Sequence, residues 1–538
     1  MIPRKGGTVM ASARKLLVVG LLMATAPGLG QAAAVLHRPL EAEPETLDPP
    51  RSSSLYDAIV ESDLFEGLVV LDGKETVLPG VAERWEVAPD GVTWTFHLRE
   101  DARWSNGDAV TAQDFVFAWR RTVDPATAAA DTDPIGKLVN AQAILAGKIT
   151  DRTKLGVEAL DDHTLRAVTA APSPTFLKQC SYRFAYPLHR ATIERWGQAW
   201  TQPGHIVGNG PFVMKSWVPQ SAITLGRSPT YWNRESIRLD EVDHIVVEND
   251  QTALKLFRSG ELDFVRAPSK EIPGLRQNHD PALHTGRDNS ISFIFFNMKE
   301  GVLAGDRRLR EALALAFDPV PIAEKVLPRG NAPAYDWVPP TVPDYTRQEP
   351  AYLSLTMAER LARARQLYAE AGYGPDHPLK LTVNYATFED TKTLMQVAAQ
   401  MWKQALGAEI TLDNEEFRVY LGRVDRGDFQ IGTLGWRGGL RDPEAFLEIW
   451  DADRPGVNNA HYADARVQAL LKSGATTMNA AERRDIYQRA ERLIVDDVAG
   501  VPVAFAAVNA LVGPRLDGWD DDVALPQSRF LSIRATPE

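Results

Sequence analysis

The sequence predicts an α/β protein with more than one domain. Its 538 residues exceed what one hydrophobic core usually supports. Two segments in which apolar and polar residues alternate predict β-hairpins in the first half of the chain. A strand–helix–strand pattern over residues 379–414 predicts a βαβ unit, whose two strands pair in parallel.

The two predicted hairpins lie at residues 84–98 and 209–228. In the first, a Pro-Asp-Gly turn separates the arms, and apolar side chains at every second position of the second arm indicate one buried face. Between the hairpins, Thr111 and Asp114 have the spacing of a capping box, which predicts a helix that begins at residue 112.

The central region changes from hairpins to longer helices. Residues 357–371 place apolar side chains on one helical stripe, and Gly372 stands where a C-cap is expected. Within the βαβ unit, residues 379–385 and 408–414 are the predicted strands, and residues 393–406 form the predicted helix.

A further strand is predicted at residues 429–436. It leads into the sequence LGWRGGLRDPEAF at residues 434–446. In open α/β sheets, ligands bind beyond the carboxyl ends of the strands. This position favours a binding loop over a solvated turn for the Trp-Arg-Gly-Gly stretch.

The first 34 residues have the pattern of a secretory signal. Basic residues precede an apolar run that is short for a membrane span, and small residues at 31–34 suit cleavage near Ala34. We therefore expect a soluble, exported mature protein. Cys180 is the single cysteine, so no intrachain disulfide can form, and we expect its side chain to be a small buried apolar group.

Several function classes are disfavoured. A net charge of −12 argues against a nucleic-acid partner, because phosphate binding needs a basic surface. The sequence has no Walker loop, no G-x-S-x-G and no H-E-x-x-H motif, and its ten histidines are scattered. Asp161, Asp162 and His163 fit a turn between two strands better than a hydrolytic site. We therefore expect no catalytic residues, no metal and no cofactor. The alternatives from other function classes are an enzyme and an export chaperone.

Several long motifs resemble one protein family. They are AEPETLDPP (42–50), LFEGLVVLDG (64–73), the run from Pro79 to Pro125, GNGPFVMKSWVPQSAITLGRSPTYWN (208–233), FRSGELDFV (257–265) and ARQLYAEAGY (364–373). On these motifs the chain resembles the periplasmic oligopeptide-binding proteins, which form family 5 of the extracellular solute-binding proteins of peptide ABC importers. The resemblance covers almost all of the chain beyond the signal segment.

The resemblance implies a three-lobed periplasmic-binding-protein fold of the large-cluster, type II-like kind. Its ligand cleft lies between lobes I and III, which close around a peptide. The expected segments are 35–65, 190–289 and 507–538 for lobe I, 66–189 for lobe II and 290–506 for lobe III. The resemblance further implies a monomer in the periplasm that meets the permease subunits of an ABC importer.

The resemblance also implies a pocket, which this chain alters. In the family, the segment matching residues 436–442 carries an aspartate that holds the ligand's α-ammonium group. Gly439 stands at that position here, and Arg437 follows Trp436. An ammonium group beside a guanidinium without a carboxylate would be penalised by repulsion and desolvation. Two further departures are Ser53 in place of an acidic residue and Thr433 in place of a basic one.

From these matches we expect Trp436, Phe417 and Leu55 to line the pocket, Phe417 in place of a tryptophan. Position alone adds Gly438 to the expected site, together with its neighbours Arg437 and Gly439. The ligand would be a peptide or peptide-like compound that is N-blocked, cyclic, acidic or derived from the cell wall. A non-peptide solute is the alternative within the same class of protein.

Two interpretations of Arg437 remain open. In the first, its guanidinium binds an anionic group of the ligand, and the N–H groups of the glycines assist. In the second, its side chain points back into lobe III and pairs with Asp442 or with a residue such as Asp428. Arg441 is expected on a solvated rim.

Overall fold

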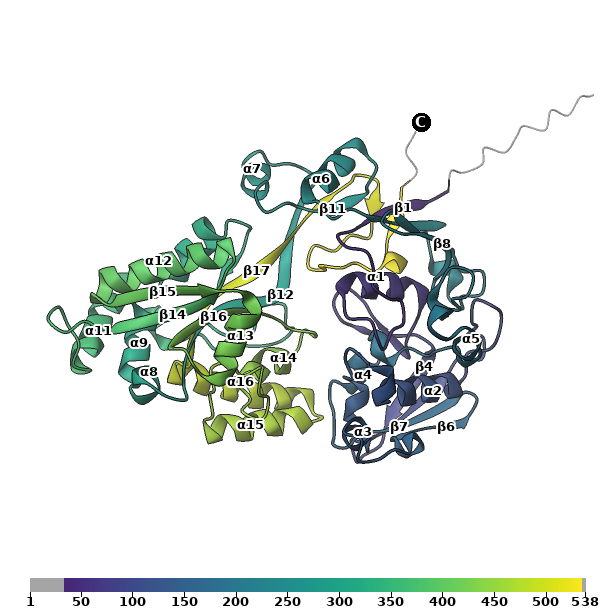
Figure 1. The fold of residues 1–538 in the computed structure, drawn as a ribbon, viewed down its shortest axis with the longest axis horizontal. Helices are drawn as coiled ribbons and strands as arrows, with labels where there is room; N and C mark the ends of the chain where they lie inside the picture. The colour runs from purple at the N-terminus through teal and green to yellow at the C-terminus, as the bar shows by residue number, and fades with distance from the viewer. Residues whose placement is uncertain (1–32, 535–538) are drawn as a thin grey trace, which may run out of the picture. The chain divides into compact units, whose positions relative to one another are not determined.

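The computed structural model describes residues 33–534. The predicted signal segment therefore falls outside the described residues, except for Ala33 and Ala34. The described chain mixes helices with mixed and antiparallel sheets, which confirms the α/β class (Figure 1). Among residues 33–534, no helix combines the length and the apolar character that a membrane crossing needs.

A four-stranded sheet carries the N-terminus of the described chain. Its strand order is β1 (Val35–Leu40), β10 (Glu241–Val246), β9 (Ala222–Arg227) and β8 (Phe212–Val218). β1 lies parallel to β10, and β8 and β9 form the predicted second hairpin, which is confirmed. Next to this sheet lies α1 (Leu55–Leu64), which begins at a capping box formed by Ser54 and Asp57.

A second four-stranded sheet is antiparallel throughout. Its order is β4 (Ala82–Val87), β5 (Thr93–Leu98), β7 (Thr164–Val168) and β6 (Val157–Asp161). The first predicted hairpin is confirmed as β4–β5, and Asp162 and His163 lie in the turn between β6 and β7 as expected. The capping box of Thr111 and Asp114 begins α2 (Ala112–Thr122). Cys180 is fully buried, and burial raises the pKa of its thiol.

The third sheet has seven strands. Their order is β11 (Phe264–Arg266), β17 (Gly500–Val512), β12 (Leu283–Phe296), β16 (Ile431–Arg437), β14 (Lys380–Ala386) and β15 (Glu409–Glu415), while β13 (Ala332–Pro333) pairs with β17. β14 and β15 are parallel and are joined by α12 (Glu389–Leu406), so the predicted βαβ unit is confirmed.

Helices cover both faces of this sheet. Alternate residues of β12 face opposite sides: Ile294 and Phe296 pack into one core, and Ile291, Phe293 and Phe295 pack into another. The predicted helix at 357–371 is α11 (Met357–Glu370). The other helices of this region are α8 (Val302–Gly305), α9 (Arg307–Leu315), α10 (Pro319–Pro321), α13 (Phe417–Arg426), α14 (Glu444–Leu447), α15 (Ala465–Thr476) and α16 (Ala480–Asp497).

The remaining elements are short. The strands are β2 (Val69–Leu71), β3 (Val77–Pro79), β18 (Leu516–Asp517) and β19 (Ser532–Ile533). The helices are α3 (Ala141–Leu145), α4 (Phe176–Gln179), α5 (Arg190–Trp196), α6 (Asp250–Ser259) and α7 (Ile272–Gln277).

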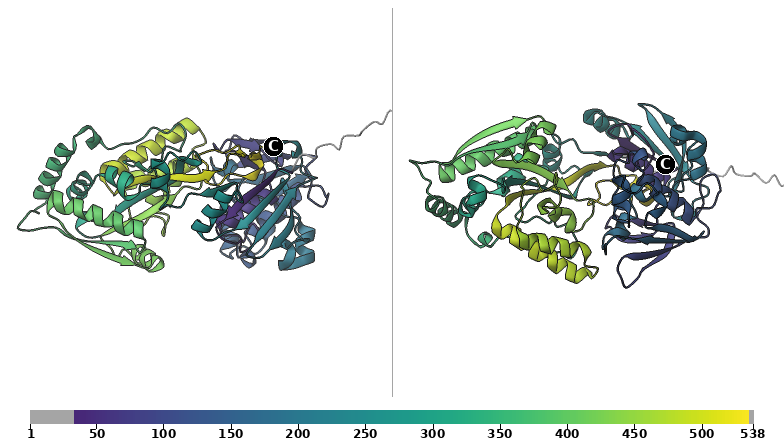
Figure 2. Two further views of the ribbon diagram at one scale, coloured as in Figure 1. Left: turned by 90° about the horizontal axis from the view of Figure 1, so that it is seen from above. Right: turned by 60° about the horizontal axis from the view of Figure 1, so that its bottom comes forward.

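Two long strands, β12 and β17, run side by side through most of their length (Figures 1 and 2). Their register shifts twice: Arg287 pairs with Ala507 and the next pair is Ile291 with Phe505, and Ser292 pairs with Ala504 and the next pair is Phe293 with Pro502. At the first and larger shift, residues 288–290 bulge out of the β12–β17 ladder opposite a single residue. The boundaries expected between lobes I and III fall at this bulge, and the division into lobes stays a prediction.

Candidate functional site

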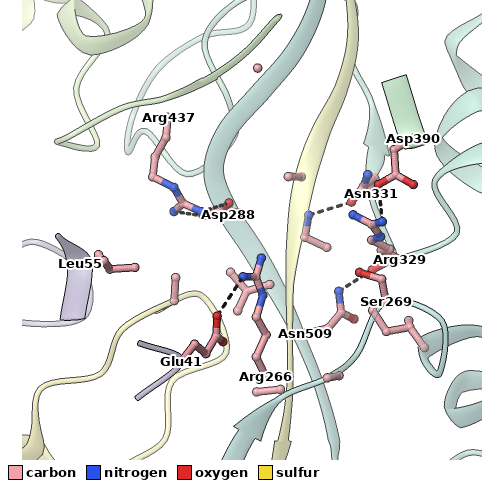
Figure 3. Close-up of a pocket in the computed structure, with 18 of the residues that line it drawn as sticks. Glu41, Leu55, Arg266, Ser269, Asp288, Arg329, Asn331, Asp390, Arg437 and Asn509 are labelled. Carbon is pink, nitrogen blue, oxygen red and sulfur yellow. Dashed lines mark hydrogen bonds and ion pairs between the residues drawn. The ribbon is translucent and has the colours of Figure 1, made fainter. Parts of the chain in front are cut away.

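A cavity of about 550 Å³ lies along the bulge between β12 and β17. One side is lined by residues of α1 and β11 and by the segment 524–526. The other side is lined by the last residues of β16, the first residues of α12 and the start of α13. The lining residues therefore come from segments expected in lobe I and from segments expected in lobe III, and Figure 3 shows several of them.

Arg437 reaches the cavity and forms a bidentate ion pair with Asp288. Its two terminal nitrogens lie 2.5 and 2.6 Å from the two carboxylate oxygens. The bulge of β12 explains the pair: Ser290 is opposite Arg437 in the ladder, and Asp288 precedes it by two residues and shares its face. Asp288 also accepts a hydrogen bond from the Ser290 hydroxyl at 2.8 Å. Figure 3 shows the pair at the cavity wall.

The partner of Arg437 differs from both expected ones. Asp442 instead accepts hydrogen bonds from Arg483 at 2.6 and 2.9 Å, and Asp428 pairs with Arg426 at 2.9 Å. Neither of the partners named in the second interpretation therefore pairs with Arg437. The reason is that the strand β16 continues through Arg437. Its side chain therefore lies on the same face of the sheet as Asp288 of the neighbouring strand β12 and contacts it.

β16 presents a free backbone edge to the cavity. β14 pairs with β16 only at residues 431 and 432. The Tyr420 hydroxyl satisfies both the N–H and the C=O of Thr433, and burial raises the pKa of Tyr420, which keeps this hydroxyl a donor. Alternate residues of a strand turn their backbone groups to the same side, so the N–H and C=O of Gly435 also face away from β12. Gly435 is exposed and lines the cavity.

Trp436 lies behind the cavity wall. Its side chain is half-buried and packs against the core below the sheet, and its indole N–H donates to the Ala445 carbonyl at 2.6 Å. Leu55 and Phe417 do line the cavity, from opposite sides, and both are exposed. The structure thus brings Arg437, Leu55 and Phe417 to one cavity and turns the Trp436 ring away from it.

The loop after Arg437 contacts other parts of the chain. The Gly438 N–H donates to the Asn289 carbonyl, and the Asn289 amide donates back to the Gly438 carbonyl. The Gly439 carbonyl accepts a hydrogen bond from the Tyr182 hydroxyl, in the segment that follows α4. A side chain at Gly438 would collide with Phe446, since a Cβ there would lie 2.6 Å from its ring. Neither glycine lines the cavity.

Arg441, expected on a solvated rim, is partly exposed and contacts two other segments of the chain. Its backbone N–H donates to both carboxylate oxygens of Glu75, each at 2.9 Å, and its guanidinium donates to the Asp522 carbonyl. Glu75 lies in the turn between β2 and β3. The loop 438–441 therefore contacts four regions that are far from it in sequence, at Glu75, Tyr182, Asn289 and Asp522.

Sequence reasoning missed several residues of the cavity. Phe388, at the carboxyl end of β14, is exposed, and its ring centroid lies 5.8 Å from that of Phe417. The rule that ligands gather at the carboxyl ends of strands could have identified it. Arg266, at the end of β11, lies one residue beyond a motif that matches the family. No sequence pattern marked Arg329, which forms an ion pair with Asp390 across the cavity wall.

The cavity lining is mostly apolar and carries charges of both signs. Four arginines line it, against three carboxylates: Arg38, Arg266, Arg329 and Arg437, with Glu41, Asp288 and Asp390. Burial and the Glu41 carboxylate raise the pKa of Tyr56, whose hydroxyl donates to Glu41 at 3.1 Å. Apolar walls with a few polar anchors are typical of a binding site for a small organic molecule. Within residues 33–534, no cluster of three His, Cys, Asp or Glu residues could hold a metal ion.

A family model matches residues 76–458 of the chain, and its description is "Bacterial extracellular solute-binding proteins, family 5 Middle". Two curated relatives come from Escherichia coli. The periplasmic oligopeptide-binding protein OppA is 35% identical over 483 residues, which cover 89% of this chain and 88% of that protein. The periplasmic murein peptide-binding protein MppA is 31% identical over 503 residues, covering 92% of this chain and 93% of that protein.

Solved structures match over nearly the whole chain. The unliganded open form of the murein tripeptide-binding protein MppA superposes with a TM-score of 0.85 at 30% identity, and the match covers 93% of this chain and 98% of that one. The Haemophilus influenzae OppA complex with the peptide RPPGFSPFR superposes with a TM-score of 0.72 at 31% identity, covering 93% and 99%. The arrangement described above is therefore more similar to the unliganded open form than to the peptide complex.

Proposed function

The chain belongs to family 5 of the bacterial extracellular solute-binding proteins, and from that premise we propose that it captures a peptide or peptide-like ligand in the periplasm and delivers it to an ABC importer. The proposal includes the partners expected from the sequence: permease subunits of the importer, no nucleic acid, no cofactor, and a monomeric state. In this role the protein binds its ligand without transforming it, so it is not an enzyme.

The observation that carries the proposal is the placement of the cavity. Its lining residues come from both sides of the β12–β17 bulge, so a bound ligand would touch α1 and β11 on one side and β16 and α13 on the other. A ligand favours a closed state only through contacts that the open state lacks. A molecule that spans this cavity gains such contacts when the two sides approach.

The free edge of β16 supports a peptide as the ligand. The N–H and C=O of Gly435 face the cavity and can pair with an extended backbone, as in β-strand addition. Hydrogen bonds to the ligand's backbone do not depend on its side chains, so this mode of binding suits a protein that carries peptides of varied sequence. The exposed rings of Phe388 and Phe417 and the exposed side chain of Leu55 would then contact the ligand's side chains.

We propose further that the ligand lacks a free α-amine or presents an acid, as N-blocked, cyclic, acidic or cell-wall-derived peptides do. Gly439 supplies no carboxylate where the family keeps an aspartate. The carboxylate that pairs with Arg437, Asp288, is nearly buried and is bound on both oxygens by its guanidinium. A ligand ammonium group would have to compete with that guanidinium, whereas an acidic group would not.

Mass spectrometry of the ligand that co-purifies with the exported protein tests the proposal. We expect peptides, enriched in blocked or acidic species. A thermal-shift series with free-amine, N-acetylated and acidic tripeptides gives the ranking, because a ligand that binds only the folded state raises its melting temperature. Free-amine tripeptides as the best ligands would overturn the proposed preference. A non-peptide compound in every preparation would overturn the peptide assignment.

A further inference from the structure

We propose that Arg266 is the residue that binds the ligand's acidic group, and that Arg437 is not. The inference rests on the proposed function and names a specificity-determining residue for it. A carboxylate held by Arg266 on the β11 side, with the ligand backbone paired to β16, would connect the two sides of the cavity.

Arg266 stands at the end of β11 with its side chain free. Phe264 and Val265 are buried, and they anchor the strand against the cores on its two faces. The Arg266 side chain is 77% exposed, and its guanidinium extends into the cavity (Figure 3). Among the described residues, its one ionic neighbour is Glu41, at 3.8 Å, and its guanidinium N–H groups form no hydrogen bond with any of them.

The other three arginines of the cavity are already engaged. Arg437 is held by both oxygens of Asp288, and Arg329 forms an ion pair with Asp390. Arg38 is buried and donates to the Pro526 carbonyl at 2.6 Å. An incoming acid would have to break one of these contacts before it could use the same donors. Arg266 offers a guanidinium whose paired N–H groups can bind both oxygens of a carboxylate at once.

Glu41 competes only weakly for Arg266. Its Oε2 atom accepts the hydrogen bond from the Tyr56 hydroxyl at 3.1 Å, and Arg266 approaches the same oxygen at 3.8 Å. Because Tyr56 is a neutral donor, Glu41 keeps this hydrogen bond when Arg266 turns away. A ligand carboxylate can therefore take Arg266 from Glu41 without leaving Glu41 unsatisfied.

The test uses two variants with the same change of charge. Arg266→Gln removes the proposed anchor. Arg258→Gln is the matched control, because Arg258 lies on the neighbouring helix α6, is about half exposed, pairs with Asp280 and does not line the cavity. The probes are two pooled libraries of N-acetylated tripeptides that are identical except for a free C-terminal carboxylate in one and a carboxamide in the other. The readout is the concentration that gives half of the maximal rise in melting temperature.

For the native protein and for Arg258→Gln, we expect this concentration to be at least tenfold lower for the carboxylate library, which corresponds to about 1.4 kcal/mol. For Arg266→Gln, we expect the two libraries to agree within about twofold. The melting temperature without ligand should be unchanged, because the Arg266 side chain has no hydrogen-bond partner to lose. A second variant, Glu41→Gln, should bind the carboxylate library several-fold more tightly, since it removes the competing charge.

Two failures are distinguishable. If both libraries stabilise the native protein equally, or if Arg266→Gln keeps the preference for the carboxylate, the inference about Arg266 is overturned while peptide binding stands. If neither library stabilises the native protein, the inference about Arg266 is overturned too, and the proposed function is then decided by mass spectrometry of the co-purified ligand: a non-peptide compound in every preparation would overturn it.

Discussion

At the scale of single residues, Arg437 and Asp288 neutralise each other on the cavity wall. Asp288 is nearly buried, whereas the Arg437 side chain is 58% exposed. Burial makes Asp288 costly to leave unpaired, and exposure screens the attraction that Arg437 offers. These two effects oppose each other, so we expect the pair to fix the position of the Asp288 carboxylate and to add only a small amount to the free energy of unfolding.

A double-mutant cycle measures that contribution. We expect Arg437→Ala and Asp288→Ala to be coupled by about 1 kcal/mol in the free energy of unfolding, measured by urea denaturation, because the contact is bidentate but half exposed. Additive effects of the two substitutions would show that the pair is not formed in solution.

Glu61, on the buried face of α1, gives the stability of the protein a dependence on pH. Burial raises the pKa of Glu61 from about 4.5 to about 8, against the lowering effect of Arg183, whose Nε lies 3.8 Å from Oε2, and of the Ser52 hydroxyl. The folded state therefore holds a proton that the unfolded state releases above about pH 4.5. Stability from this group is present below that pH and is lost as the pH rises towards 8.

Glu61→Gln removes this dependence. The amide keeps an acceptor for the Ser52 hydroxyl, so we expect the variant to gain stability over the native protein progressively between pH 5 and pH 8, by up to about 1.4 kcal/mol per pH unit. Urea denaturation at pH 5, 6.5 and 8 provides the measurement. Glu235→Gln, at a side chain that is 95% exposed, is the control and should change nothing. Parallel pH profiles for the native and Glu61→Gln proteins would contradict the assignment.

At the scale of elements, the two edges of strand β16 differ: one is paired along its length and the other is mostly unpaired. One edge pairs with β12 from residue 431 to residue 437, and the other is free beyond residue 432 apart from the Tyr420 contact at Thr433. This free edge is what the proposed function uses to hold an extended peptide.

Gly435→Pro tests the edge. Proline removes the N–H of residue 435, which faces the cavity and takes no part in the β12 ladder, so the strand should persist. We expect peptide affinity to fall by about 1 kcal/mol, roughly fivefold in Kd, for one lost hydrogen bond. Gly435→Ala is the control: its Cβ would lie 3.8 Å from the Ile291 carbonyl oxygen, an ordinary contact, and the N–H remains. Unchanged peptide affinity in the proline variant would rule out backbone pairing at this position.

Elements whose periodicity is local could be predicted from the sequence. Both hairpins, the capping box, α11 and the βαβ unit follow from patterns within about thirty residues of chain, because propensity and amphipathicity act over that range. The family resemblance supplied the larger architecture, which local patterns do not contain.

The partners of the cavity residues could not be predicted in this way. Arg437 and Asp288 are 149 residues apart, and their contact depends on a bulge in β12 that no local pattern marks. Arg441 meets Glu75 across 366 residues for a similar reason. The expectation that the strand ends before Arg437 also failed, since β16 includes this residue. Contacts between residues far apart in the sequence decide which charged side chains near a strand end are free to bind a ligand.

At the scale of the whole molecule, β12 and β17 are continuous across the boundary between the expected lobes I and III. Two strands whose register shifts at this boundary form a connection that can bend without breaking a core, because residues 288–290 stand outside the β12–β17 ladder. The cavity lies beside this connection, so a ligand there would bias any movement of one side against the other.

Small-angle X-ray scattering with and without ligand tests this account most directly. The carboxylate library of N-acetylated tripeptides, or the peptide recovered from the purified protein, should lower the radius of gyration of the native protein, and less so that of Arg266→Gln. An unchanged radius of gyration at a concentration of peptide that saturates the thermal shift would contradict closure around the ligand.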